Sequence, residues 1–317
     1  MNMFTLATKG VTPLFSRLPV RLKKLLRSQT FLVAAQKPFQ MLFWFFGLAI
    51  AIILSGCALF PSPSKAGEET IALPPSIKTL AVDAQGFRST IIRVRSEDRA
   101  DIYLTWEIKT SIPMLKEKAE QALDAARIEK REEGGFVYRI RGLSYTQGAG
   151  RIDLECSLDL LMPAGLGLQV EGNQIDIEGS FRSIESKGGR TKIFLKEQAE
   201  YLSAEALFSP LVVEGDADRV LLRTIASCSL FPENVDISLK TSLRGNVYSI
   251  NSAGSIKLLI PQDATGLLNA PQGTKIGISF KALSPAKPGR VVGYLNGADG
   301  RIINLEAGKE AALRPLP

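Results

Sequence analysis

The sequence predicts a mainly β protein, either a glycine-punctuated β-solenoid or a twisted β-sandwich, with one short amphipathic helix near residues 112–133. Three observations lead to this fold class. Apolar and polar residues alternate over many short segments, which is the period of half-buried strands. Of the 27 glycines, 22 lie between Gly134 and Gly308, where they separate these segments. A motif also recurs inside this region, as it does in coils that stack on one another.

Residues 1–40 form a basic leader. Seven Lys or Arg residues and no acids precede residue 57, and they account for the whole net charge of +7. The rest of the chain holds 32 basic and 32 acidic residues. A nucleic-acid surface needs an excess of cations, so we expect no nucleic-acid partner. Within the leader, Ser16–Ser28 is either a basic amphipathic helix for an anionic leaflet or the overlong start of a signal sequence.

Residues 41–57 are typical of a bacterial export signal. The apolar run Met41–Leu54 has 14 residues, which is the length of a signal-peptide core and short for a membrane span. The residues that follow, Leu54, Ser55, Gly56 and Cys57, resemble the lipobox of bacterial lipoproteins at all four positions. An alternative extends the run through Phe60 to 20 residues, which suits an uncleaved signal anchor.

The lipobox resemblance implies a place for the protein in the cell. It implies cleavage before Cys57, diacylglycerol on the Cys57 sulfur and acylation of the new amino terminus. Several acyl chains make a stable membrane anchor. The expected location is therefore the cell envelope, facing away from the cytoplasm. Ala58 is not the aspartate associated with inner-membrane retention, so the outer membrane is favoured if the organism has one.

Residues 58–76 are rich in Pro and Ser, and we expect an extended tether there. A β-repeat domain is predicted for residues 77–317. Its early strands are predicted at Leu80–Val82, Thr90–Arg95, Asp101–Ile108, Phe136–Arg141 and Arg151–Met162. Between the third and fourth of these, Ser111 suits a helix N-cap, and Ala119, Ala122, Leu123 and Ala126 share one helical face. The charges that follow, through Glu133, are predicted to lie on the solvated face of the same helix.

Cysteine and histidine content limits the chemistry. There is no histidine, which excludes Ser/His and Cys/His catalysis and imidazole metal sites. Cys156 and Cys228 lie on alternating apolar segments, so they form either a disulfide in an oxidising compartment or two unpaired core thiols. No phosphate-binding or calcium-binding motif is present, and we expect no cofactor and no metal.

An internal repeat supports stacked coils. The segment Gly179–Gly188 aligns with Gly245–Gly254 in the pattern G-x-(apolar)-x-S-I-x-S-x-G. Two strands end in proline, at Pro163 and Pro261. This arrangement resembles the bacterial putative-adhesin domain family, also described as an auto-transporter adhesin head. The resemblance covers nearly all of the chain after the tether and implies a β-solenoid or sandwich at the cell envelope, with no catalytic residues.

The function expected from these features is binding rather than catalysis. A lipid-anchored β-repeat domain would meet an envelope protein or polysaccharide, as an adhesin or as an envelope scaffold or sensor. The alternative is a carbohydrate-active β-helix enzyme, a lyase or glycosidase. Its candidate acids are Asp176, Glu178 and Glu185, near Arg182 and Arg190. A groove with carboxylates about 5–10 Å apart would favour that alternative.

Overall fold

The computed structural model describes residues 63–317, apart from 111–115, 145–152, 228–233 and 284–287. The chain divides into two compact units, Met1–Pro61 and Ser62–Pro317, and the described residues belong to the second. The leader, the signal run and the lipobox residues Leu54, Ser55, Gly56 and Cys57 all lie outside the described residues. Among the residues that are described, no helix is both long and apolar enough to cross a bilayer.

The second unit is built almost entirely of strands, and its one described α-helix is α4 (Lys116–Ala125). The strands are β1 (Ser64–Ala72), β2 (Thr79–Gln85), β3 (Ser89–Glu97), β4 (Asp101–Thr110), β5 (Arg127–Glu133), β6 (Val137–Leu143), β7 (Leu154–Pro163), β8 (Gly167–Gly179), β9 (Ser183–Leu195), β10 (Ala199–Leu207), β11 (Leu211–Glu214), β12 (Ala217–Ile225), β13 (Ile237–Lys240), β14 (Val247–Ser252), β15 (Ile256–Ile260), β16 (Gly266–Pro271), β17 (Lys275–Ile276), β18 (Phe280–Ala282), β19 (Arg290–Leu295), β20 (Ile302–Ala307) and β21 (Ala311–Pro315). The mainly β prediction is confirmed.

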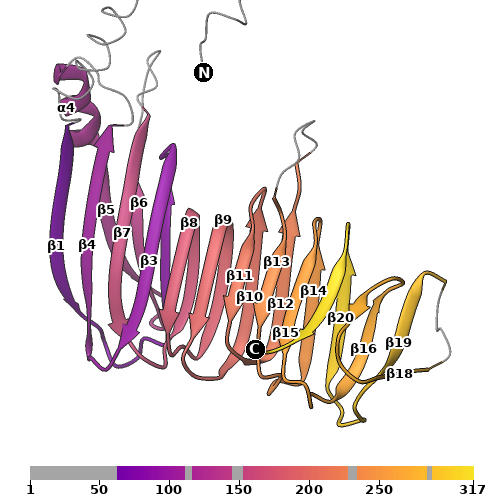
Figure 1. The fold of residues 1–317 in the computed structure, drawn as a ribbon. Helices are drawn as coiled ribbons and strands as arrows, with labels where there is room; N and C mark the ends of the chain where they lie inside the picture. The colour runs from indigo at the N-terminus through magenta and orange to yellow at the C-terminus, as the bar shows by residue number, and fades with distance from the viewer. Residues whose placement is uncertain (1–62, 111–115, 145–152, 228–233, 284–287) are drawn as a thin grey trace, which may run out of the picture. The chain divides into compact units, whose positions relative to one another are not determined.

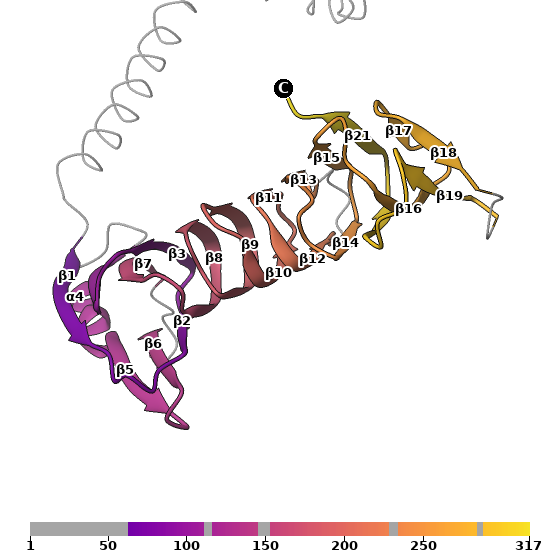
Figure 2. The ribbon, with the colours of Figure 1, turned by 90° about the horizontal axis from the view of Figure 1, so that it is seen from below.

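The strands stack in parallel as successive coils, and each coil contributes to two runs (Figures 1 and 2). In the first run the order is β6, β2, the first half of β8, the first half of β9, β10, β12, β14, β20 and β16. In the second run it is β7, β3, the second halves of β8 and β9, β11, β13, β15, β21 and β17. This parallel stacking is that of a solenoid, and it decides between the two predicted architectures.

Columns of inward side chains fill the space between the runs. Because stacked coils are in register, each inward position repeats from coil to coil. In the first run one column contains Leu80, Leu168, Ile184, Leu202, Val220, Tyr248 and Ile303. In the second run another contains Leu160, Val94, Ile177, Ile193, Val213, Leu239, Leu258 and Leu313. All of these side chains are buried. The core is therefore continuous along the stack.

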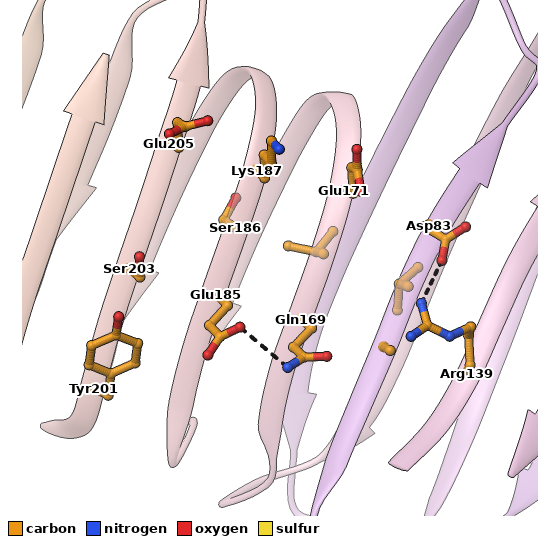
Figure 3. A pocket seen from close by; sticks show the side chains of 13 residues that line it. Asp83, Arg139, Gln169, Glu171, Glu185, Ser186, Lys187, Tyr201, Ser203 and Glu205 are labelled. Atoms are coloured by element: carbon orange, nitrogen blue, oxygen red, sulfur yellow. Dashed lines mark hydrogen bonds and ion pairs between the residues drawn. The ribbon is translucent and has the colours of Figure 1, made fainter. Parts of the chain in front are cut away.

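The turn between the two runs admits only small inward side chains. The column beside it contains Gly172, Gly188, Ala206, Thr224, Ser252 and Ala307. A Cβ on Gly188 would lie 1.8 Å from the carbonyl oxygen of Gly172. The close approach of two backbones at this corner therefore requires glycine there. Figure 3 shows β8 and β9 turning over at this end of the coil.

At both ends of the stack the spatial order of the coils differs from their order in the chain. The coil of β2 and β3 lies between the coil of β6 and β7 and that of β8. The coil of β20 and β21 likewise lies between β14 and β15 on one side and β16 and β17 on the other. Antiparallel strands then complete each end: β5, β4 and β1 at one, β19 and β18 at the other.

Two predicted boundaries were wrong. The predicted tether of residues 58–76 includes β1, which pairs with β4 over its whole length, so the backbone of Ser64–Ala72 is held in the sheet. The predicted helix of residues 112–133 ends at Ala125, because Arg127–Glu133 forms β5 and pairs with β6. Gly134 and Gly135, at φ 61° and 75°, are the central residues of the turn in which Phe136 N donates to Glu133 O, between β5 and β6. Tertiary pairing outweighs the helical charge pattern here.

The predicted repeat has the correct faces but the wrong register. Ser183 stacks on Tyr201, Tyr201 on Arg219 and Arg219 on Val247. The motif instead aligned Ser183 with Ser249, two residues further along. A slip of two residues in a strand keeps each side chain on its own face, so Ile184 and Ile250 of the motif both point inward. The other apolar position of the motif is not equivalent, because Phe181 is buried whereas Val247 stacks on Arg219 on the outer face. The segment from Glu197 onward, where the motif is irregular, forms regular coils in β10, β11 and β12.

Candidate functional site

A hollow of about 530 Å³ lies on the outer face of the first run, across β6, β2, β8, β9 and β10 (Figure 3). Its polar lining is Asp83, Arg139, Gln169, Glu171, Glu185, Ser186, Lys187, Tyr201, Ser203 and Glu205. The strands place most of these side chains by simple alternation. Residues between two inward positions point outward, and in-register coils bring their outward positions side by side.

A row of charges crosses the hollow from strand to strand. In register the row is Arg141, Asp83, Glu171, Lys187, Glu205 and Arg223. Neighbouring strands are about 4.8 Å apart, so adjacent members of this row lie near one another. The signs alternate except between Asp83 and Glu171. Alternating signs let a flat parallel sheet carry charges in register without repulsion between neighbours.

One end of the row is fixed by Asp83. Asp83 points outward but is only 5% exposed, because two arginines of β6 cover it. Arg139 Nη1 lies 2.8 Å from Asp83 Oδ2, and Arg141 Nε lies 2.7 Å from Oδ1. The hydrogen bond with Asp83 raises the pKa of Arg141. This cluster joins β6 to β2, so its charges are already compensated within the fold.

The charged side chains at the centre of the hollow form fewer interactions within the protein. Lys187 lies between Glu171 on β8 and Glu205 on β10, and among the described residues neither Lys187 nor Glu171 forms an ion pair or a side-chain hydrogen bond. Glu185 accepts a hydrogen bond from Gln169 Nε2 at 3.3 Å, and Glu205 lies 3.7 Å from Arg223 Nη1. These side chains offer both donors and acceptors to a polar ligand (Figure 3).

The structure separates the acids that the sequence put forward for catalysis. Asp176 and Glu178 belong to the second half of β8 and lie on the second run. Glu185 belongs to the first half of β9 and lies in the hollow on the first run. Glu171, Lys187 and Glu205 were not identified from the sequence. Only the register of the coils brings them together, and no spacing in the chain signals it.

The predicted sulfur sites are tested only in part. Cys156 is 2% exposed in the core of β7, has no disulfide partner among the described residues, and burial raises the pKa of its thiol to about 12. Cys228 lies outside the described residues, so both alternatives, a Cys156–Cys228 disulfide and two unpaired core thiols, remain predictions. The same holds for lipidation of Cys57. In the part of the chain that the structure describes, no three His, Cys, Asp or Glu side chains are grouped closely enough to hold a metal ion.

No protein-family model matches the chain, and no curated protein matches it. Solved structures resemble it at low identity, as three examples show. A "putative cell adhesion protein" from Clostridium sporogenes has 10% identity and a TM-score of 0.28, over 80% of this chain and 100% of that one. A "putative adhesin" from Parabacteroides distasonis has 11% identity and a TM-score of 0.32, over 79% and 97%. A second "putative adhesin", from Parabacteroides merdae, has 10% identity and a TM-score of 0.32, over 79% of this chain and 96% of that one. At these scores the likeness transfers no function.

Proposed function

We propose that this chain is a lipid-anchored protein of the bacterial cell envelope that binds another envelope component through the outer face of its first run, without catalysis. The observation that carries the proposal is the hollow around Lys187, where Glu171 and Lys187 have no partner among the described residues. Such groups are free to bind a polar ligand. The structural neighbours are described as adhesins or cell-adhesion proteins, but the proposal rests on this surface.

Binding is favoured over catalysis by the openness of the site. Glu171 and Glu185 are exposed, and the hollow lies on the face of a sheet. Catalytic carboxylates usually act in a cleft that excludes water, where their charges are strengthened. One observation favours the enzyme as a second candidate. Glu171 and Glu205 flank Lys187 on alternate strands, which places their backbones about 10 Å apart.

The binding proposal is tested by photo-crosslinking in living cells. A photoreactive amino acid at Ser203, inside the hollow, should give a crosslinked envelope component. The matched control is Thr105, which points outward from β4, away from the hollow. Equal crosslinking from both positions, or none from Ser203, would contradict the proposal. If the protein releases reducing ends from an envelope polysaccharide and Glu205→Gln abolishes that release, the binding proposal is wrong and the protein is a carbohydrate-active enzyme.

The anchor is tested separately by metabolic labelling with palmitate. Cys57→Ser should abolish incorporation, because the Cys57 sulfur is the site of diacylglycerol attachment that the lipobox resemblance implies. Cys156→Ser should leave labelling unchanged, since that thiol is buried in the core. Labelling that persists in Cys57→Ser would overturn the lipobox interpretation. Mass spectrometry of the amino terminus then distinguishes a cleaved lipoprotein from an uncleaved signal anchor.

A further inference from the structure

The outer face of the second run carries a second hollow, of about 390 Å³, with an aromatic ring in it. Phe194 on β9 is 41% exposed, and Val212 on β11 is exposed to the same extent. Both line the hollow, together with charged side chains of β3, β8 and β11. Single exposed apolar side chains are common on protein surfaces, so what this ring can bind depends on the side chains around it.

Carboxylates lie on both sides of the Phe194 ring. Phe194 lies in register between Glu178 on the neighbouring strand β8 and Glu214 on the neighbouring strand β11. Each carboxylate is held by a lysine: Lys196 Nζ lies 3.3 Å from Glu178 Oε1, and Lys240 pairs with Glu214. The ring therefore has a charged donor and acceptor group on either side, at the spacing of neighbouring strands.

Two cations beside the ring remain without a partner. Arg95 on β3 lies beside Glu178 on β8, and Lys192 on β9 lies beside Val212 on β11. Among the residues that the structure describes, neither forms an ion pair or a side-chain hydrogen bond, whereas Arg93 is paired with Asp159 at 3.1 Å. The hollow therefore combines two exposed apolar side chains, two acids paired with lysines, Asp176, which accepts a hydrogen bond from Gln174 Nε2 at 3.0 Å, and two cations without a partner among the described residues.

We propose that this hollow binds a sugar ring of an acidic glycan. A pyranose has one face of C–H groups and a rim of hydroxyls. The negative face of an aromatic ring attracts those C–H groups, and charged side chains around it bind the hydroxyls. Arg95 and Lys192 would take the carboxylate of a uronic acid.

A protein partner fits this hollow less well. Two apolar side chains are too small a patch for the core of a protein–protein interface. A stacked nucleotide base would also use the ring and the cations, so a single-stranded oligonucleotide is one arm of the test. The site goes beyond the proposed function, because it lies on the other run of strands and shares no residue with the first hollow.

The test is affinity electrophoresis of the full chain in detergent, through native gels that contain polygalacturonate. The gel should retard the wild type, and Phe194→Ala should weaken binding about tenfold. Phe194→Tyr keeps the ring and should bind like the wild type. Phe136→Ala is the matched control, because Phe136 is 57% exposed on a distant hairpin. Neutral dextran should retard the chain less than polygalacturonate, and Arg95→Gln should remove that difference.

Three results would overturn the proposal. Equal retardation of the wild type and Phe194→Ala would show that the ring does not bind the glycan. Equal retardation by dextran and polygalacturonate would exclude the acidic ligand. Binding of a single-stranded oligonucleotide, without binding of polygalacturonate, would make this a nucleic-acid surface. Crosslinking from Ser203 in the first hollow is independent of all three results.

Discussion

At the scale of single residues, Asp216 is the clearest example of a buried charge that holds the fold together. It directly precedes β12, is 8% exposed, and accepts hydrogen bonds from the segment between β13 and β14 and from Tyr248 of β14. The donors are Thr241 Oγ1, Ser242 Oγ, Ser242 N at 3.1 Å, Arg244 N at 3.2 Å and Tyr248 Oη at 3.2 Å. A carboxylate surrounded by donors can replace several missing ladder bonds at a corner of the coil.

Asp216 should make stability depend on pH. Burial alone would raise its pKa, but the hydrogen bonds from Ser242, Thr241 and Arg244 together lower it. A lowered folded-state pKa means that the stabilisation is complete above the unfolded-state value near 3.9 and is lost as pH falls through the folded-state value. Asp216→Asn should therefore lower the free energy of unfolding by about 1–3 kcal/mol at pH 7.

The measurement is urea unfolding of the wild type and Asp216→Asn at pH 7 and again at pH 3. The difference between them should shrink in acid, because the wild-type carboxylate then approaches its protonated form. Asp263→Asn is the control, since Asp263 is exposed. A constant difference at both pH values would mean that the charge of Asp216 does not contribute.

At the scale of elements, β1 is a strand where the sequence predicted a tether. The segment has prolines on either side and contains Gly, Glu and Lys, which is typical of a tether. In the structure it is the edge strand beside β4, and the indole of Trp106 lies against Gly67. A Cβ on Gly67 would lie 2.7 Å from Trp106 Cζ2. Only the missing side chain lets the indole lie flat on this strand.

Gly67→Val should therefore detach β1 without unfolding the coils. Hydrogen exchange of the Ser64–Ala72 amides should become at least about tenfold faster, because the strand loses its ladder bonds to β4. Amides of β9, in the middle of the stack, should keep their protection. Gly297→Ala is the matched control, since an added Cβ there lies 3.8 Å from its nearest neighbour, Thr265 Cγ2. Unchanged exchange in β1 would show that the segment behaves as a tether after all.

These elements show how far the sequence predicts the fold. Alternation identified β2, β3, β4 and β6 and their inward residues, because period two is a local property of the chain. Helical spacing also placed Ala119 and Leu123 on the buried face of α4, and Ala126, directly after the helix, is buried as well. Alternation could not give the register between coils, since slipping by two residues leaves the pattern unchanged. Both hollows depend on that register, so Lys187 with its neighbouring acids, and Phe194 between two carboxylates, appear only in the structure.

At the scale of the whole unit, both ends of the stack are interlocked. In a simple solenoid the last coil in the chain is also the last in space, so its loss leaves the others intact. Here β20 and β21 end the chain but lie inside the stack, between β14 and β15 and the pair β16 and β17. Ile303, Leu305 and Leu313 of this coil are fully buried. Burying each is worth about 1.5–3 kcal/mol.

A chain that ends at Gly300 should therefore lose far more than one coil. Removing three fully buried side chains already approaches the net stability of a domain, about 5–15 kcal/mol. It also leaves β14 and β16 without their shared partner, so the strands from β14 to β19 should exchange their amides as if unfolded. Deleting Ser64–Ala72 is the comparison, because β1 lies at an edge, and it should leave β6 to β21 protected. If both deletions leave the rest of the stack equally protected, β20 is not an interior strand. The stack would then follow the order of the chain, with each coil added to the one before it.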